Sequence, residues 1–368
     1  NIDDCWQGDR DPKTKALMGN ERFPDMKGLC DYVHERGLKI GIYSSPWIGT
    51  YAGFRGGTSD NPDAADPKCL PEDKRLQPNQ IFGRQGTKDM GISFFNAPRI
   101  GKYWFLDRDF KAMADWGFDY IKLDWHPNDV PTTERMAKEL RASGRDIVMS
   151  LSNTAPIKNA PELSKLAQLW RTGPDIHDSW DSISRCFNEF DWVKFQSPGH
   201  WNDMDMLQVG MRGRPNLFNA PPKKTNLTPD EQYTHMSMWC LQSNPLLLSC
   251  YVDKLDDFTL SLLTNDEVIE VNQDPAGKQV QRVVKAENLE VWFKPMEDGS
   301  VAVGLFNRGD KEAEIDVTWA DLGRQGPQKI RDLWRQKDLG SHAESFRSKV
   351  NPHGVVLVNV STAPSGAK

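Results

Sequence analysis

Aspartates recur in this 368-residue sequence wherever a short apolar run ends, most of them beside a tryptophan. The six are Asp3, Asp4, Asp124, Asp175, Asp203 and Asp205. A pair of carboxylates bordered by aromatic rings can cleave a glycoside, one acting as nucleophile and the other as acid and base. Converging carboxylates can also hold a metal ion for hydrolysis, and a single aspartate at such a position can simply cap the following helix.

Two basic residues accompany these aspartates. Lys122 precedes Asp124 by two residues, so both side chains lie on one face if this run is a strand. A neighbouring ammonium lowers the pKa of a carboxyl group and keeps it ionised, as a nucleophile requires. Arg171 precedes Asp175 by four residues and could donate hydrogen bonds to sugar hydroxyls or form a structural ion pair.

Short β-rich runs that alternate with helical stretches must position these residues. The predicted strands are residues 2–3, 39–43, 120–124, 147–151, 169–171, 200–203 and 246–249, and helices are predicted at residues 26–36 and 110–117. Such alternation favours a parallel sheet. With an eighth strand expected upstream of Asn1, in one missing βα unit, the count predicts a (β/α)8 barrel in which residue 2 lies beside the strand at residues 39–43. A doubly wound sheet is the alternative, but no GxGxxG or GxxxxGK[ST] motif follows any strand.

Two further regions differ from this alternation. Residues 44–103 form a long connection rich in Gly, Pro, Asp and Asn, which we expect to overhang the active face because it follows the carboxyl end of a strand. After residue 276, strand-like runs at residues 289–293, 301–306, 313–317 and 355–360 alternate with turns. The sequence therefore predicts a catalytic barrel over residues 1–276 and an antiparallel β-sandwich over residues 277–368.

Composition argues against several classes of function. The sequence has 46 Lys and Arg against 52 Asp and Glu, and its net charge of −6 is spread along the chain. We therefore expect neither nucleic acid nor an anionic membrane as a partner, since both require a concentrated basic surface. No run approaches the ~20 apolar residues of a membrane span. The cysteines and histidines lack zinc-site spacing, and the GxSxG motif of serine hydrolases is absent.

Taken together, the motifs resemble glycoside hydrolase family 27, which contains α-galactosidases and α-N-acetylgalactosaminidases. The resemblance is carried by Asn1-Ile2-Asp3-Asp4-Cys5-Trp6, Tyr120-Ile121-Lys122-Leu123-Asp124, Trp170-Arg171, Asp175-Ile176, Asp178-Ser179-Trp180, Trp201-Asn202-Asp203-Met204-Asp205-Met206-Leu207 and Val271-Asn272-Gln273-Asp274-Pro275. These motifs span nearly the whole chain in order, and their combination is specific although each alone is weak. The resemblance implies a barrel with a C-terminal β-sandwich and a retaining exo-enzyme that releases terminal α-D-galactose.

The resemblance also implies roles for individual residues. By position, Asp124 is the nucleophile and Asp175 the general acid and base of a double displacement that needs no metal or cofactor. Their carboxyl groups should lie about 5–6 Å apart. The positions that match sugar-binding residues are Asp3, Asp4, Tyr43, Lys122, Ser152, Arg171 and Asp205.

Some positions depart from the family pattern. Trp125-His126-Pro127 follows the predicted nucleophile, where the family usually has a small residue and a cysteine. Ser152 and Ala155 are three residues apart, as in α-N-acetylgalactosaminidases, so that specificity remains an alternative. Four other functions are also alternatives. They are a β-L-arabinopyranosidase, an isomaltose-releasing dextranase, an inactive sugar-binding relative, and a metal-dependent hydrolase that uses Asp3, Asp4 and Asp205. We expect an oligosaccharide or glycan substrate and a secreted or periplasmic location. A homo-oligomer is compatible with this function.

Overall fold

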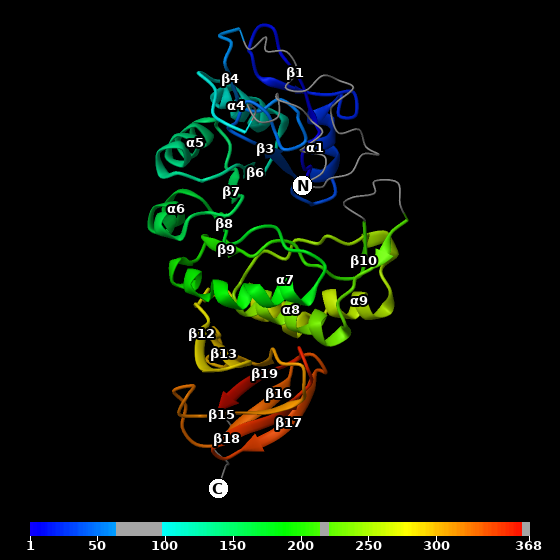
Figure 1. Cartoon of the computed structure of the whole chain (residues 1–368), viewed down its shortest axis with the longest axis vertical. Coiled ribbons are helices and arrows are strands. Elements are labelled where there is room, and N and C mark those ends of the chain that lie inside the picture. The colour runs from blue at the N-terminus through cyan, green and yellow to red at the C-terminus, as the bar shows by residue number, and fades with distance from the viewer. Residues whose placement is uncertain (64–97, 214–220, 363–368) are drawn as a thin grey trace. The chain divides into compact units, whose positions relative to one another are not determined.

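A computed structural model describes residues 1–63, 98–213 and 221–362 of the chain (Figure 1). The backbone forms two compact units, each described by itself below. Unit 1 comprises Asn1–Pro174 with Arg214–Pro221, and unit 2 comprises Asp175–Gly213 with Pro222–Lys368. Residues 64–97 of the predicted long connection lie outside the described residues. In the described parts of both units, no helix has the length and apolar character needed to cross a lipid bilayer.

Unit 1 contains a parallel sheet whose strands are joined by helices. Its strands, in spatial order, are β3 (Gly41–Ser44), β6 (Tyr120–Asp124), β7 (Val148–Ser152) and β8 (Leu169–Arg171). The connecting helices are α1 (Met26–His34), α4 (Leu106–Trp116), α5 (Val130–Ala142) and α6 (Ala160–Leu166), with a 3-10 turn, η2 (Ile157–Asn159), before α6. The four predicted strands and two predicted helices of this region are thereby confirmed within a few residues.

The first residues of the chain lie beside this sheet, as predicted. Ile2 forms a parallel bridge with Ile42. The Ile2 N–H donates to the Gly41 carbonyl at 2.8 Å, and the Tyr43 N–H donates to the Ile2 carbonyl at 2.9 Å. Asp3 and Asp4 therefore follow directly from a segment whose backbone is held against β3.

Local sequence explains where these helices begin and end. Asp25 caps α1 by accepting the Gly28 N–H, and Asp129 caps α5 by accepting the Thr132 N–H. Gly117 ends α4 with φ of +106°, a left-handed conformation that favours glycine. Only three residues therefore separate α4 from the strand β6 that follows it.

Two small antiparallel strand pairs extend unit 1. β1 (Gln7–Arg10) pairs with β2 (Leu17–Gly19), and β4 (Thr58–Ser59) pairs with β5 (Tyr103–Trp104). Arg10 connects them to the rest of the unit, because its guanidinium binds both carboxylate oxygens of Asp109 in α4 at 2.7 and 3.0 Å. The same guanidinium donates to the Gly56 carbonyl at 2.6 Å, so it also holds the segment that follows β3.

Unit 2 begins with helices and short strands. These elements are α7 (Trp180–Arg185), η3 (Cys186–Phe195), β9 (Trp201–Asp203), β10 (Met211–Arg212), β11 (Lys223–Lys224), α8 (Pro229–Leu241), η4 (Val252–Lys254), α9 (Asp257–Leu263) and α10 (Asp266–Gln273). The predicted strand at residues 246–249 is wrong, since only Leu248 forms an isolated bridge, with Leu207. Its apolar residues are half-buried or exposed, and its pairing with the segment at Leu207 extends over one residue, too short for a strand.

The C-terminal part of unit 2 is an antiparallel sandwich. One sheet has the order β12 (Gln281–Ala286), β13 (Leu289–Pro295), β14 (Val301–Asn307), β19 (Val355–Thr362), β16 (Gln328–Asp332) and β17 (Lys337–His342). The other pairs β15 (Ala313–Thr318) with β18 (Ser345–Val350). The four predicted strands are present, whereas β12, β16, β17 and β18 were not predicted. β17 is almost wholly exposed and therefore lacks the alternating apolar pattern that identifies a strand.

Alternate residues of the six-stranded sheet enter two different cores. Val291 and Val303 belong to the core between the two sheets, whereas Trp292 and Phe306 pack into a core shared with α8. Gly304 permits this second contact, because a Cβ atom there would lie 2.8 Å from the Leu241 Cδ1 atom of α8. This shared core makes the helices of unit 2 and the sandwich one compact unit, and the predicted domain boundary at residue 276 remains a prediction.

Candidate active site

The parallel register of unit 1 collects seven of the nine predicted site residues at the carboxyl ends of its strands. Tyr43 of β3 lies opposite Lys122 of β6, and Asp124 at the end of β6 lies opposite Ser152 at the end of β7. β8 continues this edge with Arg171, while Asp3 and Asp4 follow the bridge beside β3. Carboxyl ends of neighbouring parallel strands are where barrel enzymes place their reactive groups.

Lys122 lies among the acidic residues. Its Nζ atom donates to Asp3 Oδ2 at 3.0 Å and lies 5.4 Å from the centre of the Tyr43 ring. Burial opposes protonation of Lys122, but the carboxylates of Asp3 and Asp124 outweigh it and raise the pKa of this side chain. Lys122 therefore remains a cation and favours the ionised form of Asp124.

Asp4 is held by backbone groups that the sequence could not reveal. Its Oδ1 atom accepts the Cys5 N–H at 2.7 Å, and its Oδ2 atom accepts the Ala52 N–H at 3.0 Å. Although part of the residue reaches solvent, desolvation by the surrounding protein raises the pKa of Asp4 to about 7, against the hydrogen bonds from Ala52, Thr50 and Cys5. Asp4 is thus a carboxyl group fixed mainly by peptide N–H groups rather than by a cation.

Tyr43 forms a buried wall next to these carboxyl groups. Only 1% of its surface is exposed, and its carbonyl accepts the Trp6 indole N–H at 2.8 Å. Burial, together with the carboxylates of Asp4 and Asp124, raises the pKa of Tyr43 well above its ordinary value. Its hydroxyl group therefore stays protonated at any physiological pH.

The segment after Asp124 interlocks with the segment after β7. The Trp125 N–H donates to the Ser152 carbonyl at 2.7 Å, and the Asn153 N–H donates back to the Trp125 carbonyl at 2.9 Å. The Ala155 N–H donates to the Arg171 carbonyl at 3.0 Å. Both Ser152 and Ala155 are buried, Ser152 opposite Asp124 and Ala155 bonded to the Arg171 carbonyl.

An aromatic cluster occupies the position where the chain departs from the family pattern. The His126 ring lies 5.0 Å from that of Trp47, edge to face, and its Nδ1 atom is 3.2 Å from the Tyr51 hydroxyl. Trp47 and Tyr51 also contact each other, with ring centres 5.2 Å apart. Sequence reasoning does not find this cluster, because the histidine is far from the other two residues in the chain and none lies in a recognisable motif.

The remaining two predicted site residues, Asp175 and Asp205, belong to unit 2. Asp175 is exposed and lies in the loop before α7. The next residue, Ile176, donates its N–H to Asp205 Oδ2 at 2.8 Å, so the two predicted positions are close neighbours. The separation of Asp124 and Asp175, which lie in different units, remains a prediction.

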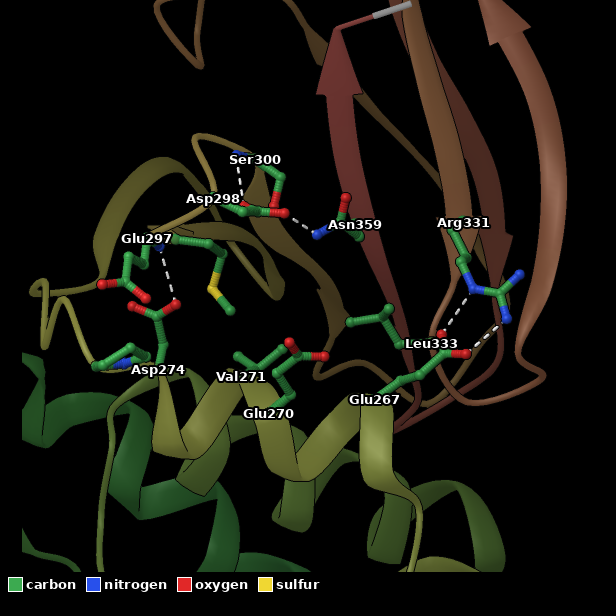
Figure 2. A pocket seen from close by; sticks show the side chains of 12 residues that line it. Glu267, Glu270, Val271, Asp274, Glu297, Asp298, Ser300, Arg331, Leu333 and Asn359 are labelled. Carbon is green, nitrogen blue, oxygen red and sulfur yellow. Dashed lines mark hydrogen bonds and ion pairs between the residues drawn. The ribbon is translucent and has the colours of Figure 1, made fainter.

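Other polar clusters do not compete with this site. In the described ranges, no group of three or more His, Cys, Asp or Glu side chains has the arrangement needed to hold a metal ion. A pocket of about 410 Å³ lies between α10 and the sandwich and contains several acidic side chains (Figure 2). Two of its carboxylates serve local structure, since Glu267 pairs with Arg331 at 2.5 Å and Asp274 accepts the Glu297 N–H at 2.9 Å. None of the predicted site residues lines it.

Comparison with known proteins agrees with this arrangement. A family model described as alpha galactosidase A matches residues 1–72 and 65–274, and one described as the alpha galactosidase C-terminal beta sandwich domain matches residues 286–360. A probable alpha-galactosidase of Dictyostelium discoideum is 32% identical over 98% of this chain and 82% of its own length. Alpha-galactosidase 2 of Arabidopsis thaliana is 33% identical over 96% of this chain and 77% of its own length.

Solved structures extend the similarity to the fold. The crystal structure of a GH27 β-L-arabinopyranosidase from Geobacillus stearothermophilus matches 98% of this chain and 83% of its own chain, with a TM-score of 0.79 and 27% identity. The fold class is therefore the predicted one, a (β/α)8 barrel followed by an antiparallel β-sandwich. With a family model over most of the chain and relatives above 30% identity, this chain belongs to glycoside hydrolase family 27, the α-galactosidase family.

Proposed function

We propose that this chain is a retaining exo-glycoside hydrolase that releases terminal α-D-galactose. The observation that carries the proposal is the cluster in unit 1. There the Lys122 ammonium donates a hydrogen bond to Asp3, and the carboxylates of Asp3 and Asp124 raise its pKa. Fixed carboxylates around one ammonium suit the closely spaced hydroxyls of a single sugar ring. The α-galactosidases named above, at 32% and 33% identity, support galactose as that sugar.

The proposed reaction has two steps. A carboxylate oxygen of Asp124 forms a bond to the anomeric carbon while the bond from that carbon to the leaving oxygen breaks and Asp175 gives its proton to the leaving oxygen. Asp175 then takes a proton from water, and the water oxygen displaces Asp124 from the anomeric carbon. Lys122 supports this role of Asp124 because its positive charge stabilises the carboxylate.

The other unit 1 residues are proposed to bind the sugar. Asp4 and Asp3 accept hydrogen bonds from hydroxyls that distinguish galactose, above all the axial O4 group. An epimer would leave a desolvated carboxylate without its partner, which is a strong basis for discrimination. Tyr43 provides the buried wall described above, and Arg171 donates to further hydroxyls.

A second specificity has its own support. Ser152 and Ala155 are both small and buried beside Asp124 and Arg171, which would leave room for an acetamido group at the sugar 2-position. The α-N-acetylgalactosaminidase of Gallus gallus is 29% identical to this chain. α-N-Acetylgalactosaminidase activity is therefore the second candidate function.

A panel of p-nitrophenyl glycosides tests both candidates. We expect the α-D-galactoside to be hydrolysed fastest, with α-anomeric galactose as the first product in proton NMR spectra. Faster hydrolysis of the α-N-acetylgalactosaminide or the β-L-arabinopyranoside would replace the proposed specificity. An initially β-anomeric product would contradict the retaining mechanism.

The domain boundaries, the location and the oligomeric state of the enzyme are further parts of the proposal. We propose that residues 1–276 form the catalytic barrel and residues 277–368 the sandwich, and that the substrate is an oligosaccharide or glycan met outside the cytoplasm. Fractionation of the source cells would test the location. Light scattering after size-exclusion chromatography would show whether the protein forms a homo-oligomer.

A further inference from the structure

The loop that carries Asp175 has no regular secondary structure, yet side chains hold the residues that follow it. The Ile176 N–H donates to Asp205 Oδ2, and the His177 N–H donates to Ser182 Oγ, both at 2.8 Å. Asp178 accepts the Thr225 hydroxyl at 2.5 Å and the Asn226 N–H at 2.9 Å. Three consecutive residues after Asp175 are therefore fixed by contacts within unit 2.

The contact with Asp205 bears most directly on Asp175. The Ile176 nitrogen belongs to the peptide group that also contains the Asp175 Cα and carbonyl, and these atoms share one plane. Ile176 is buried, so loss of this hydrogen bond would leave its N–H without the acceptor that replaces water. A carboxylate that holds the Ile176 N–H thus sets the orientation of the peptide from which the Asp175 side chain departs.

Asp205 is itself held in an unusual conformation. Its φ is +83°, which is costly for a residue other than glycine and persists only where the surroundings enforce it. Its N–H donates to Asp203 Oδ1 at 2.8 Å, and its carbonyl accepts the Trp239 indole N–H at 2.8 Å. Asn244 Oδ1 accepts the N–H of the preceding residue, Met204, at 3.0 Å. Trp239 and Asn244 are almost fully buried, so α8 and the residues after it provide a rigid support.

From these contacts we propose that Asp205 is a positioning residue for Asp175 rather than a residue that binds the sugar. Trp239 donates to the Asp205 carbonyl, Asn244 accepts the N–H of the preceding Met204, and the Asp205 carboxylate orients the peptide after Asp175. The inference rests on the proposed function, in which Asp175 donates the proton to the leaving group. It reassigns the role that the family resemblance implied for Asp205.

Two substrates separate the two roles. An α-glycosyl disaccharide has a poor leaving group that requires a proton from Asp175, whereas the fluoride of the same sugar does not. For Asp205→Ala we expect kcat/KM on the disaccharide to fall about 10²-fold, since a misplaced acid loses much of its catalytic contribution. On the fluoride, kcat/KM should change less than about 5-fold, because no general acid is needed in that step.

Further variants give matched controls. Asp205→Asn retains an oxygen that accepts the Ile176 N–H and should recover most of the activity on the disaccharide. Asp274→Asn makes the same substitution at another buried unit 2 aspartate that accepts backbone N–H groups, and should leave the ratio between the two substrates unchanged. Inhibition by the free sugar should be the same in Asp205→Ala as in the wild type.

Hydrogen exchange reports on the contact without relying on activity. A peptide that contains residue 176 should exchange faster in Asp205→Ala than in the wild type, and at the wild-type rate in Asp205→Asn. Equal losses on both substrates with weakened inhibition by the free sugar would identify Asp205 as a sugar-binding residue and overturn the proposal, as would unchanged exchange at residue 176. The substrates carry whichever sugar the panel selects, so a wrong sugar assignment overturns the proposed specificity and leaves this comparison decisive.

Discussion

The two proposed catalytic aspartates are held by different means. Asp124 is the last residue of β6, is 9% exposed and lies in register with Ser152 of β7. Asp175 is an exposed loop residue whose following peptide N–H is bound by Asp205. A sheet positions a side chain through strand register, whereas a loop depends on individual acceptors for its backbone groups.

The surroundings of the two aspartates differ in a corresponding way. Unit 1 places a cation, Lys122, among the carboxylates of Asp3 and Asp124, and a second buried cation, Arg10, on Asp109. In the unit 2 loop, the Asp205 carboxylate accepts a backbone N–H, and the uncharged side chains of Trp239 and Asn244 bind the backbone around Asp205. We therefore expect the site residues of unit 1 to respond mainly to changes in charge, and the loop that carries Asp175 to respond mainly to the loss of hydrogen bonds to its backbone.

The largest expected effect follows from removing the charge of Asp124. Asp124→Asn keeps the size of the side chain but removes the nucleophile, so kcat/KM on a glycosyl fluoride should fall by about 10⁴-fold or more. Asp115→Asn, at an exposed position that pairs with Lys111, should retain wild-type activity. If Asp124→Asn kept more than about a tenth of the wild-type kcat/KM, Asp124 would not be the nucleophile.

Asp175→Ala should behave differently from Asp124→Asn. Once the glycosyl-enzyme has formed from an activated substrate, azide can attack without a general base, so added azide should partly restore turnover of Asp175→Ala. Azide should not restore turnover of Asp124→Asn in this way, because that variant lacks the nucleophile and forms no glycosyl-enzyme for azide to attack. Absence of rescue by azide, with wild-type folding shown by circular dichroism, would argue against Asp175 as the acid and base.

The next effect concerns the stability of unit 1. Arg10→Met leaves Asp109 buried without its cation, so the free energy of unfolding should fall by about 3–5 kcal/mol at pH 7. Burial already raises the pKa of Asp109 even with Arg10 present, so the deficit should shrink as the pH is lowered and the carboxyl group becomes protonated. Urea denaturation at pH 7 and pH 5 measures both quantities. A double variant, Arg10→Met with Asp109→Asn, should recover much of the loss, and no recovery would show that packing dominates.

Asp4 should show a smaller effect that is specific to catalysis. In Asp4→Ala the hydroxyl held by the carboxyl group loses a charged hydrogen bond, which corresponds to about 3 kcal/mol or about 10²-fold in kcat/KM for the galactoside. Asp4→Asn should retain the contact with Ala52 while losing the charge, and should fall between Ala and wild type. Unchanged kcat/KM in Asp4→Ala would exclude a role for Asp4 in holding the galactose hydroxyls.

The smallest expected effect concerns a buried histidine of unit 2. His235 is fully buried, its Nε2 atom accepts the Gln208 N–H at 2.9 Å, and burial lowers its pKa to about 3. In the unfolded chain this histidine takes up a proton near pH 6.5, so the free energy of unfolding should fall by about 2–3 kcal/mol between pH 7 and pH 4.5. His235→Gln keeps an acceptor without the titration and should show a flatter profile. An equally steep profile in His235→Gln would assign the acid sensitivity to other groups.

Much of the site was predictable because its spacing is local. Lys122 and Asp124 share a face of β6 because side chains of a strand alternate, and this holds whatever lies around the strand. The barrel and sandwich likewise follow from alternating and apolar runs, although the run at residues 246–249 pairs only through a single bridge with Leu207. Asp175 and Asp205 were predicted as site residues from the family motifs that contain them.

What only the tertiary structure decided are the contacts made by backbone groups and by residues far apart in the chain. Ala52 holds Asp4 and Ile176 is held by Asp205 through peptide N–H groups, which every residue except proline possesses and which therefore leave no mark in the sequence. Tyr51 and His126 meet only because the segments after β3 and β6 leave neighbouring strands. Residue type and spacing determine which chemistry is available, whereas the folded backbone determines which groups are close enough to use it.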